Sequence, residues 1–296
     1  MLAVFPPPKR KTSIEVFIPA SLLEDSPDLK MKTMKLGFIA RAFAIYRVDK
    51  VVIYPDRSFD EQYDDMNFIE LILSYMKTPQ YLRKHVYPLM PELRYVGLLP
   101  PLATPNHPLA RSSRDISEEY REGFVLKIKG GAAIIDAGLE RYITLKLSYV
   151  PSRIKVGDFV LLRVYRDNDR ISCEVVDKNS VSTFLCYDVQ KIRHTIGKYL
   201  QRKRNYYDLI IATSRYGVHI TKIMNEIKGK LKNARTIAVL FGGPYEGLFE
   251  ILKREGLRLD EVTDFIINTI PYQGTRTVRT EEAIHATLAI LNIIMQ

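Results

Sequence analysis

The 296-residue sequence lacks the features that mark membrane, secreted and disulfide-bonded proteins. It has no run of about 18 apolar residues, which argues against a membrane-spanning helix, and the apolar stretch over residues 1–5 is too short for a signal peptide. Its two cysteines, Cys173 and Cys186, have no C-x-x-C spacing, so we expect buried thiols and neither a disulfide nor zinc. These absences predict a cytoplasmic protein without membrane contact.

Motifs of several enzyme classes are missing as well. The five histidines form no H-x-x-x-H or H-x-x-E pair, and no G-x-S-x-G nucleophile elbow occurs, so neither metal-dependent hydrolysis nor serine-type hydrolysis has support. The glycine-bearing stretches near the C-terminus contain neither the Gly-Lys-Ser/Thr of a P-loop nor the G-x-G-x-x-G dinucleotide fingerprint. An oxidoreductase that uses a dinucleotide is therefore disfavoured.

The net charge is strongly positive. With 44 basic and 34 acidic residues the formal charge is +10 and the isoelectric point is near 9.4, which favours contact with a polyanion, most naturally nucleic acid. The run Arg202-Lys203-Arg204 lies close to three tyrosines, a pattern that can hold phosphates and stack bases. We take these three residues as candidates for RNA contact. A solvated helix end is the alternative at this run, and a modestly basic composition for solubility is the alternative for the chain.

The two ends of the chain show alternating strands and helices, which is typical of a mostly parallel sheet flanked by helices in an α/β fold. Predicted strands cover residues 13–18, 51–54, 208–213, 235–241 and 263–269. Predicted helices cover residues 29–43, 68–76, 188–202, 219–230, 245–255 and 281–295.

The middle of the chain has a different character. Six prolines between residues 87 and 114 forbid a long helix and mark a boundary. Five short strands follow, over residues 122–129, 132–137, 142–145, 159–165 and 170–176, separated by glycine and aspartate turn signals. Five such strands indicate a small OB-like β-barrel. We therefore predict an inserted barrel domain over 87–179 with a proline-rich lead-in, and one discontinuous α/β domain over 1–86 and 180–296.

Two glycine-bearing stretches, 240–247 and 268–282, each follow a predicted strand and open a predicted helix. They bring bare backbone to the carboxyl ends of strands, where open α/β sheets bind their ligands. Glutamates occupy the first turn of both helices and would repel a phosphate. A cationic ligand without phosphate fits better, and S-adenosylmethionine, an adenosine that carries a sulfonium, is such a ligand. An ordinary strand-to-helix turn is the alternative.

Three ordered blocks now suggest a family: YDLIIATSRYG at 207–217, FGGPYEGL at 241–248 and NTIPYQGTRTVRTEEA at 268–283. Their order closely resembles that of trefoil-knotted SPOUT-class RNA methyltransferases. More narrowly, the chain is similar to the archaeal and eukaryotic branch in which an OB-type barrel interrupts the catalytic domain. The resemblance implies a knotted SPOUT-like sheet, S-adenosylmethionine as cofactor and S-adenosylhomocysteine as product. Threading of the segment after Asn268 through an earlier loop would bring the two glycine stretches together as one pocket.

The resemblance also implies which residues contact the cofactor, mainly through their backbone. These are Thr213, Leu240, Phe241, Gly242, Gly243, Glu246, Gly247, Asn268, Ile270, Pro271, Gln273, Gly274, Thr275 and Thr280. Asn268 and Gln273 would supply side-chain hydrogen bonds, although Asn268 could instead cap the end of its strand. Glu246 would either contact the methionine ammonium or offset the helix dipole. The pairs Pro244-Tyr245 and Pro271-Tyr272 depart from the family pattern and put the pocket shape in doubt.

Methyl transfer from a sulfonium is an in-line displacement, in which the protein chiefly positions donor and acceptor and manages the proton of the acceptor. If the acceptor is a uridine ring nitrogen, an arginine aimed at the deprotonated base would stabilise its charge. Arg215 and Arg276 are the catalytic candidates, and Arg279 is a candidate for phosphate contact. A surface ion pair is the alternative for any one of them.

The predicted helix 281–295 is apolar nearly all round. One face of a terminal helix packs on its own sheet, so the other is expected to meet a second copy of the chain in a two-fold dimer. Enclosure within a monomer is the alternative. Members of the resembled family are homodimers through this helix, with the substrate site shared across the interface.

Together these observations predict an S-adenosylmethionine-dependent RNA methyltransferase that acts on structured ribosomal RNA, with N3 of uridine as the atom that the family suggests. The alternative is a non-catalytic RNA-binding or ribosome-assembly protein that uses the barrel and the basic surface.

Overall fold

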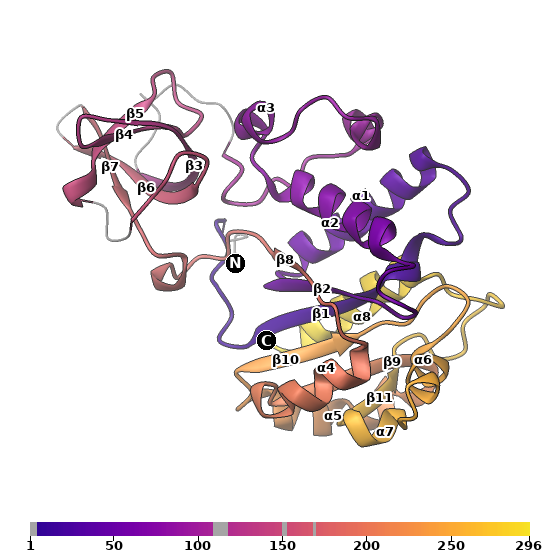
Figure 1. Ribbon diagram of the computed structural model, residues 1–296. Coiled ribbons are helices and arrows are strands. Elements are labelled where there is room, and N and C mark those ends of the chain that lie inside the picture. The colour runs from indigo at the N-terminus through magenta and orange to yellow at the C-terminus, as the bar shows by residue number, and fades with distance from the viewer. Residues whose placement is uncertain (1–4, 109–117, 150–152, 168–169) are drawn as a thin grey trace. The chain divides into compact units, whose positions relative to one another are not determined.

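The computed structural model describes residues 5–108, 118–149, 153–167 and 170–296, and the chain forms two compact units. One unit contains residues 10–74, 91–100 and 187–296 and is built around a parallel sheet (Figure 1). The other contains the described residues of 1–9, 75–90 and 101–186 and is built around an antiparallel sheet. Each sheet has its own apolar core.

The parallel sheet has six strands in the order β11-β9-β10-β1-β2-β8, and every neighbouring pair is parallel. Its strands are β1 (Ser13–Pro19), β2 (Lys50–Tyr54), β8 (Asp188–Lys191), β9 (Leu209–His219), β10 (Thr236–Leu240) and β11 (Phe265–Asn268). Strands β1, β2 and β10 are buried almost throughout, as their continuous apolar sequences require when both faces of a sheet are covered. The predicted parallel sheet flanked by helices is confirmed.

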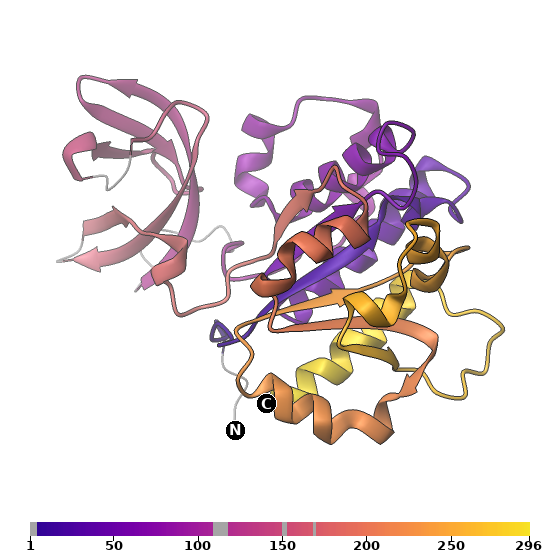
Figure 2. The same ribbon diagram turned by 60° about the horizontal axis from the view of Figure 1, so that its bottom comes forward.

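Helices cover both faces of this sheet (Figure 2). They are α1 (Leu29–Ile45), α2 (Tyr63–Lys77), α4 (Ile196–Lys203), α5 (Ile220–Leu231), α6 (Leu248–Arg254), α7 (Leu259–Val262) and α8 (Thr280–Ile294). Apolar residues of α4, α6 and α7 share one core with those of β1, β2, β9 and β10. Helices α1 and α8 pack against each other, with the rings of Phe38 and His285 at 4.1 Å between centroids.

The antiparallel sheet has the order β5-β4-β3-β6-β7 and rolls into a nearly closed barrel (Figure 2). Its strands are β3 (Glu118–Lys129), β4 (Ala132–Asp136), β5 (Ile143–Lys146), β6 (Phe159–Asp167) and β7 (Arg170–Val175). The predicted five short strands are confirmed. The short helix α3 (Arg83–Val86) belongs to the same unit.

The predicted helix over residues 188–202 is wrong in its first part. Residues Asp188–Lys191 form strand β8, and α4 begins only at Ile196. Strand β8 pairs in parallel with β2 and ends the sheet, so backbone pairing with a distant strand decides the conformation of these residues. Local periodicity carries no information about that partner.

Strand β9 is longer than its predicted range of 208–213. It pairs with β11 through Ala212 and Ile266 and then resumes with Val218 opposite Ile267, so residues 213–217 have no partner in β11. The strand therefore contains a wide bulge, and Arg215 lies inside β9, whereas the sequence places it just beyond the strand end. Bulges of this kind redirect side chains and are frequent next to active sites.

Within the described part of the proline-rich lead-in, residues 87–108, the chain makes the 3-10 turns Pro91–Leu93 and Val96–Leu98 and no long helix. None of the helices in the described ranges is long and apolar enough to cross a membrane.

Candidate active site

A pocket of about 320 Å³ lies at the carboxyl ends of β9, β10 and β11. Its volume is in the range of small-molecule sites. The lining residues come from the β9 bulge, the end of β11, both glycine stretches, the first turn of α6 and the start of α8. They are Thr213, Ser214, Arg215, Tyr216, Phe241, Gly242, Gly243, Pro244, Tyr245, Gly247, Glu250, Ile267, Asn268, Thr269, Ile270, Gln273, Thr277, Val278, Thr280 and Ala283. The two stretches that the sequence singles out thus meet in one pocket.

The bulge in β9 depends on Gly217. A Cβ atom at this position would lie 2.6 Å from the carbonyl carbon of Ile267, a distance that no side chain can occupy. Glycine therefore lets the backbones of β9 and β11 pass close together where their pairing resumes. The residues before it, including Arg215 and Tyr216, are displaced from the ladder into the pocket wall.

The side chain of Asn268 links the bulge to the second glycine stretch. Its amide nitrogen donates to the carbonyl oxygen of Arg215 at 3.0 Å, and its amide oxygen accepts from the backbone N–H of Ile270 at 2.9 Å. On the other side of β9, the hydroxyl of Thr213 donates to the carbonyl oxygen of Leu240 at 2.8 Å. The ends of three strands are therefore held in a fixed relation around the pocket.

The first glycine stretch forms a tight turn before α6. The N–H of Gly243 donates to the carbonyl oxygen of Glu246 at 2.8 Å. A Cβ atom at Gly243 would lie 2.5 Å from the hydroxyl oxygen of Ser21, and one at Gly242 would lie 2.9 Å from the Cα of Gly247. Gly242 needs to be glycine because its backbone passes close to the backbone of Gly247, whereas the close contact at Gly243 is with a single side-chain atom.

The start of α8 closes the pocket from another side. The hydroxyl of Thr280 donates to the carbonyl oxygen of Gly242 at 3.3 Å. The carboxylate of Glu282 accepts from the N–H of Arg279 at 2.9 Å, which is the glutamate half of a capping box. The two glycine stretches are thus joined at the first turn of the last helix.

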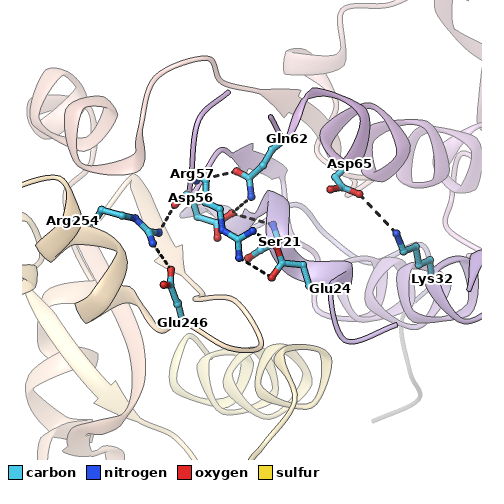
Figure 3. Close-up of polar contacts among 9 residues, drawn as sticks. All are labelled: Ser21, Glu24, Lys32, Asp56, Arg57, Gln62, Asp65, Glu246 and Arg254. Carbon is cyan, nitrogen blue, oxygen red and sulfur yellow. Dashed lines mark hydrogen bonds and ion pairs between the residues drawn. The ribbon is translucent and has the colours of Figure 1, made fainter. Parts of the chain in front are cut away.

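A polar network supports the first glycine stretch from outside the pocket (Figure 3). The guanidinium of Arg254 contacts the Glu246 carboxylate at 2.6 Å and also donates to the carbonyl oxygen of Asp56. The Asp56 carboxylate accepts from the N–H of Ser21 and from the side chain of Gln62, both at 3.0 Å. Residues distant in sequence therefore fix the turn that carries the glycines.

A buried tyrosine fixes the end of β10. The phenol of Tyr54 in β2 donates to the carbonyl oxygen of Phe241 at 2.6 Å. Burial raises the pKa of Tyr54 well above its ordinary value, and the nearby carboxylate of Asp56 raises it further. The phenol therefore stays protonated and remains a donor at any physiological pH.

The charge of the lining is small. Among the described residues at the lining, the formally charged side chains are Arg215 and Glu250, and apolar side chains supply much of the remaining wall. A polyphosphate site would need several cations or free helix amides. This lining instead suits a largely uncharged ring system and a small cationic group.

The structure brings most of the predicted cofactor residues to the lining, although their binding roles stay predictions. Those at the lining are Thr213, Phe241, Gly242, Gly243, Gly247, Asn268, Ile270, Gln273 and Thr280. Those outside it are Leu240, Glu246, Pro271, Gly274 and Thr275. The carboxylate of Glu246 is engaged by Arg254, and Asn268 and Gln273 both use side-chain groups for hydrogen bonds within the protein.

Sequence reasoning missed Glu250, which is the carboxylate at the lining. The turn at Gly243 delays the start of α6 to Leu248, three residues later than predicted, so Glu250 and not Glu246 falls in the first helical turn. A Cβ atom at Gly247 would lie 3.0 Å from the Glu250 carboxylate. Gly247, which occupies the N-cap of α6, was the signal that would have moved the predicted helix start past Glu246 to Leu248.

The two catalytic candidates separate in the structure. Both side chains are exposed, but Arg215 is at the lining, with its guanidinium 4.7 Å from the ring centroid of Tyr216, and Arg276 is outside the lining. Arg279 is exposed and precedes α8.

The predicted RNA-contact run at the end of α4 is largely engaged by neighbours. Arg202 contacts His194 at 2.7 Å, and Arg204 forms an ion pair with Asp264. Lys203 is exposed and lies 5.6 Å from the ring centroid of Tyr206. Of the three, Lys203 keeps its charge most available to a ligand.

Comparison with known proteins gives concordant matches over nearly the whole chain. Residues 13–291 match the model of a family described as "Putative RNA methyltransferase". An uncharacterized protein of Haloarcula marismortui is 32% identical over 94% of this chain and 98% of its own length. The 28S rRNA (uridine-N(3))-methyltransferase of Homo sapiens is 28% identical over 95% of this chain and 78% of its own length. The protein of that name from Drosophila melanogaster is 29% identical over 96% of this chain and 63% of its own length.

Proposed function

Since the chain belongs to this family of RNA methyltransferases, we propose that it methylates N3 of a uridine in ribosomal RNA with S-adenosylmethionine as the methyl donor. The single observation that carries the proposal is the pocket at the ends of β9, β10 and β11, where both glycine stretches and one arginine converge. The names of the insect and human relatives supply the substrate and the atom.

The residues of the pocket fit this cofactor. Its apolar members, Phe241, Ile267, Ile270, Val278 and Ala283, can enclose an adenine ring. The glycines leave backbone groups accessible where a side chain would otherwise stand, and only one cation is present to oppose a positive ligand. When bound, S-adenosylmethionine supplies the electrophilic methyl group. We assign its contacts to the predicted cofactor residues at the lining.

We assign the cationic end of the ligand to Glu250. Its carboxylate is at the lining, whereas that of Glu246 is already paired with Arg254 at 2.6 Å. A carboxylate facing an ammonium or a sulfonium in a partly enclosed site is favourable at neutral pH.

Arg215 is the residue that we assign to transition-state charge. Loss of the N3 proton leaves a negative charge spread over the uracil ring, and a guanidinium held at the pocket wall stabilises it. The bulge presents Arg215 to the pocket, and Asn268 fixes its backbone. Arg276, outside the lining, is assigned a contact with RNA beyond the target base, together with Lys203 and Arg279.

We further propose that the segment after Asn268 threads through an earlier loop in a SPOUT-type knot. The hydrogen bond between Thr280 and Gly242 and the order β11-β9-β10 are compatible with such threading. We also propose that residues 87–179 form an inserted OB-type domain within a methyltransferase domain over 1–86 and 180–296. The order of the five barrel strands supports the OB-type assignment, and all five strands fall within residues 87–179.

The outer faces of α1 and α8 support a homodimer. Met31, Met34 and Phe38 are exposed at helical spacing on α1, and Ile293 is exposed on α8. Exposed apolar side chains in such a row mark an interaction surface. We propose that a second copy of the chain covers this face through the C-terminal helix.

The function is tested by incubating the purified protein with methyl-labelled S-adenosylmethionine and ribosomal RNA from cells that lack the modification. Nucleosides are then identified by mass spectrometry. Labelled 3-methyluridine is the expected product, and calorimetry should show cofactor binding by the protein alone. Salt-sensitive RNA binding without methyl incorporation would instead identify a non-catalytic RNA-binding protein.

A further inference from the structure

Three exposed tyrosines lie at or next to the pocket lining. Tyr216 comes from the β9 bulge, Tyr245 from the first glycine stretch and Tyr272 from the second. Their exposed fractions are 67%, 72% and 92%. Tyr216 and Tyr245 are at the lining, and the ring of Tyr272 meets that of His219, which is in register with the lining residue Asn268. Three separate segments thus each carry a solvent-exposed tyrosine at or next to the lining.

The backbone of Tyr272 is held in an unusual conformation. Its φ angle is +56°, in the left-handed region that residues other than glycine and asparagine rarely adopt. Its ring meets the ring of His219 edge to face at 5.1 Å between centroids. A bulky residue kept in this conformation and yet exposed indicates a functional constraint rather than a packing one.

The two glycine stretches share a sequence feature at their tyrosines. In each, the tyrosine follows a proline, in Pro244-Tyr245 and Pro271-Tyr272. Proline fixes its own φ angle and so reduces the conformational freedom of the chain directly before each tyrosine.

Tyr216 carries a cation beside its ring. The guanidinium of Arg215 lies 4.7 Å from the ring centroid, so one face of the tyrosine is covered by a flat positive group. Guanidinium planes and tyrosine rings are both surfaces on which proteins stack unpaired RNA bases. This group of tyrosines therefore combines stacking surfaces with positive charge, unlike the apolar face formed by α1 and α8.

We propose that Tyr216, Tyr245 and Tyr272 form a stacking clamp for unpaired bases that flank the target nucleotide. The inference rests on the proposed function. Bases inside a duplex already stack on each other and cannot reach these rings, so the enzyme takes its uridine from a single-stranded or unwound segment. Stacking does not discriminate strongly between bases, so the clamp sets the structural state of the substrate, and sequence preference has to come from elsewhere.

The absence of tryptophan from the chain allows a direct binding test. The Tyr272→Trp variant has a single tryptophan, whose fluorescence is titrated with single-stranded decauridylate and with a blunt RNA duplex. We expect quenching by the single strand and little change with the duplex. Tyr63→Trp is the matched control, because Tyr63 is also exposed, at the start of α2, and packs edge to face on Phe59. Its emission should not respond to either RNA.

Two results would overturn the clamp. One is an equal response of the Tyr272→Trp and Tyr63→Trp proteins to decauridylate. The other is an emission of Tyr272→Trp that changes with protein concentration and not with RNA, which would show that a second copy covers this position.

Steady-state kinetics separate the clamp from the proposed function. Tyr216→Ala and Tyr272→Ala should each raise KM for RNA about tenfold, the loss expected for one base–aromatic stack, with KM for S-adenosylmethionine unchanged. The Tyr216→Phe and Tyr272→Phe variants keep the ring and should behave like the wild type. If the wild type methylates RNA and the alanine variants keep its KM, the clamp is wrong and the function stands. If the wild type methylates no RNA, the function is wrong, and the fluorescence titration still decides the clamp.

Discussion

The amide nitrogen of Asn268 donates to the carbonyl oxygen of Arg215 at 3.0 Å, although 53 residues separate them in the sequence. The amide oxygen of the same side chain accepts from the N–H of Ile270. One side chain therefore fixes the backbone position of the arginine that we assign to catalysis and that of the loop that we assign to the cofactor. A displacement of β11 would move both together.

Replacement of Asn268 by alanine should weaken the site and the fold. The carbonyl oxygen of Arg215 and the N–H of Ile270 then lose their hydrogen-bond partner. Each of these groups that stays buried lowers the free energy of unfolding by about 1–3 kcal/mol. We expect kcat/KM to fall as well, because the bulge loses its tie to β11. Urea unfolding and methyl transfer measure the two effects. Asn179→Ala, at an exposed position, is the control and should change neither quantity. An unchanged kcat/KM for Asn268→Ala would remove the positioning role.

Gly243→Ala should destabilise the protein because its Cβ would lie 2.5 Å from the hydroxyl oxygen of Ser21. Overpacking of this kind costs about 1–3 kcal/mol. In a Ser21→Ala background the nearest Ser21 atom is the Cβ at 3.7 Å, an ordinary contact, so the second substitution should restore most of the loss. A double-mutant cycle by urea unfolding tests this coupling. Additive effects of the two substitutions would contradict it.

A glycine in α5 provides the opposite case. A Cβ atom at Gly229 would meet nothing within 4 Å, and the residue lies in the interior of a helix. Gly229→Ala should therefore stabilise the protein by about 0.5–1 kcal/mol. Its melting temperature should rise, whereas that of Gly243→Ala should fall.

The two catalytic arginine candidates should differ in rate. Arg215→Ala removes a donor from the pocket lining, and kcat should fall about 10²-fold, as for other groups that stabilise transition-state anions. Arg276→Ala changes an exposed residue outside the lining and should affect KM for RNA more than kcat. For each variant, methylation of ribosomal RNA is followed at several RNA concentrations, which gives kcat and KM for RNA. Full turnover by Arg215→Ala would exclude it from the mechanism.

His107 should make stability depend on pH in the mildly acidic range. Its pKa is lowered from 6.5 to about 4, mainly by burial and also by the nearby Arg83, although a hydrogen bond to the carbonyl oxygen of Lys77 acts in the opposite direction. The folded state therefore binds fewer protons than the unfolded state between these values. Stability is complete above pH 6.5 and falls as the pH drops toward 4, by at most about 3 kcal/mol. The slope of unfolding free energy against pH should flatten in His107→Gln, and an unchanged slope would contradict the assignment.

The proposed dimer predicts a change in mass on a single substitution. Phe38→Glu places a charge in the exposed apolar row of α1, so it should convert a dimer into a monomer in sedimentation velocity. Leu89→Glu alters a fully exposed apolar residue outside this row and should leave the mass unchanged. A wild type that sediments as a monomer at every concentration would end the dimer proposal.

Patterns within short windows predicted much of the molecule. The buried strands β1, β2 and β10 have continuous apolar sequences, and the five barrel strands are separated by strong turn signals. The two glycine stretches stand out in the sequence because glycines that follow a predicted strand indicate either a turn or a ligand site at the end of the sheet. These features depend on neighbours in sequence, which the sequence itself supplies.

The remaining features depend on distant partners. Strand β8 exists because β2 offers an edge, and the bulge in β9 exists because Gly217 lets the backbone pass Ile267. The choice of Glu250 over Glu246 depends on a turn that Arg254 and Asp56 stabilise from outside. No local periodicity reports such contacts, so the pocket was predicted in outline and its wall residues only in part.

The bond from Arg254 to the carbonyl oxygen of Asp56 spans 198 residues, and Thr280 reaches back to Gly242. A nascent chain that has not yet released its last helix would therefore possess most of its sheet and still have no complete pocket. Binding of the proposed cofactor therefore has to wait until α8 has been synthesised, and this ligand can stabilise only chains that already carry that helix.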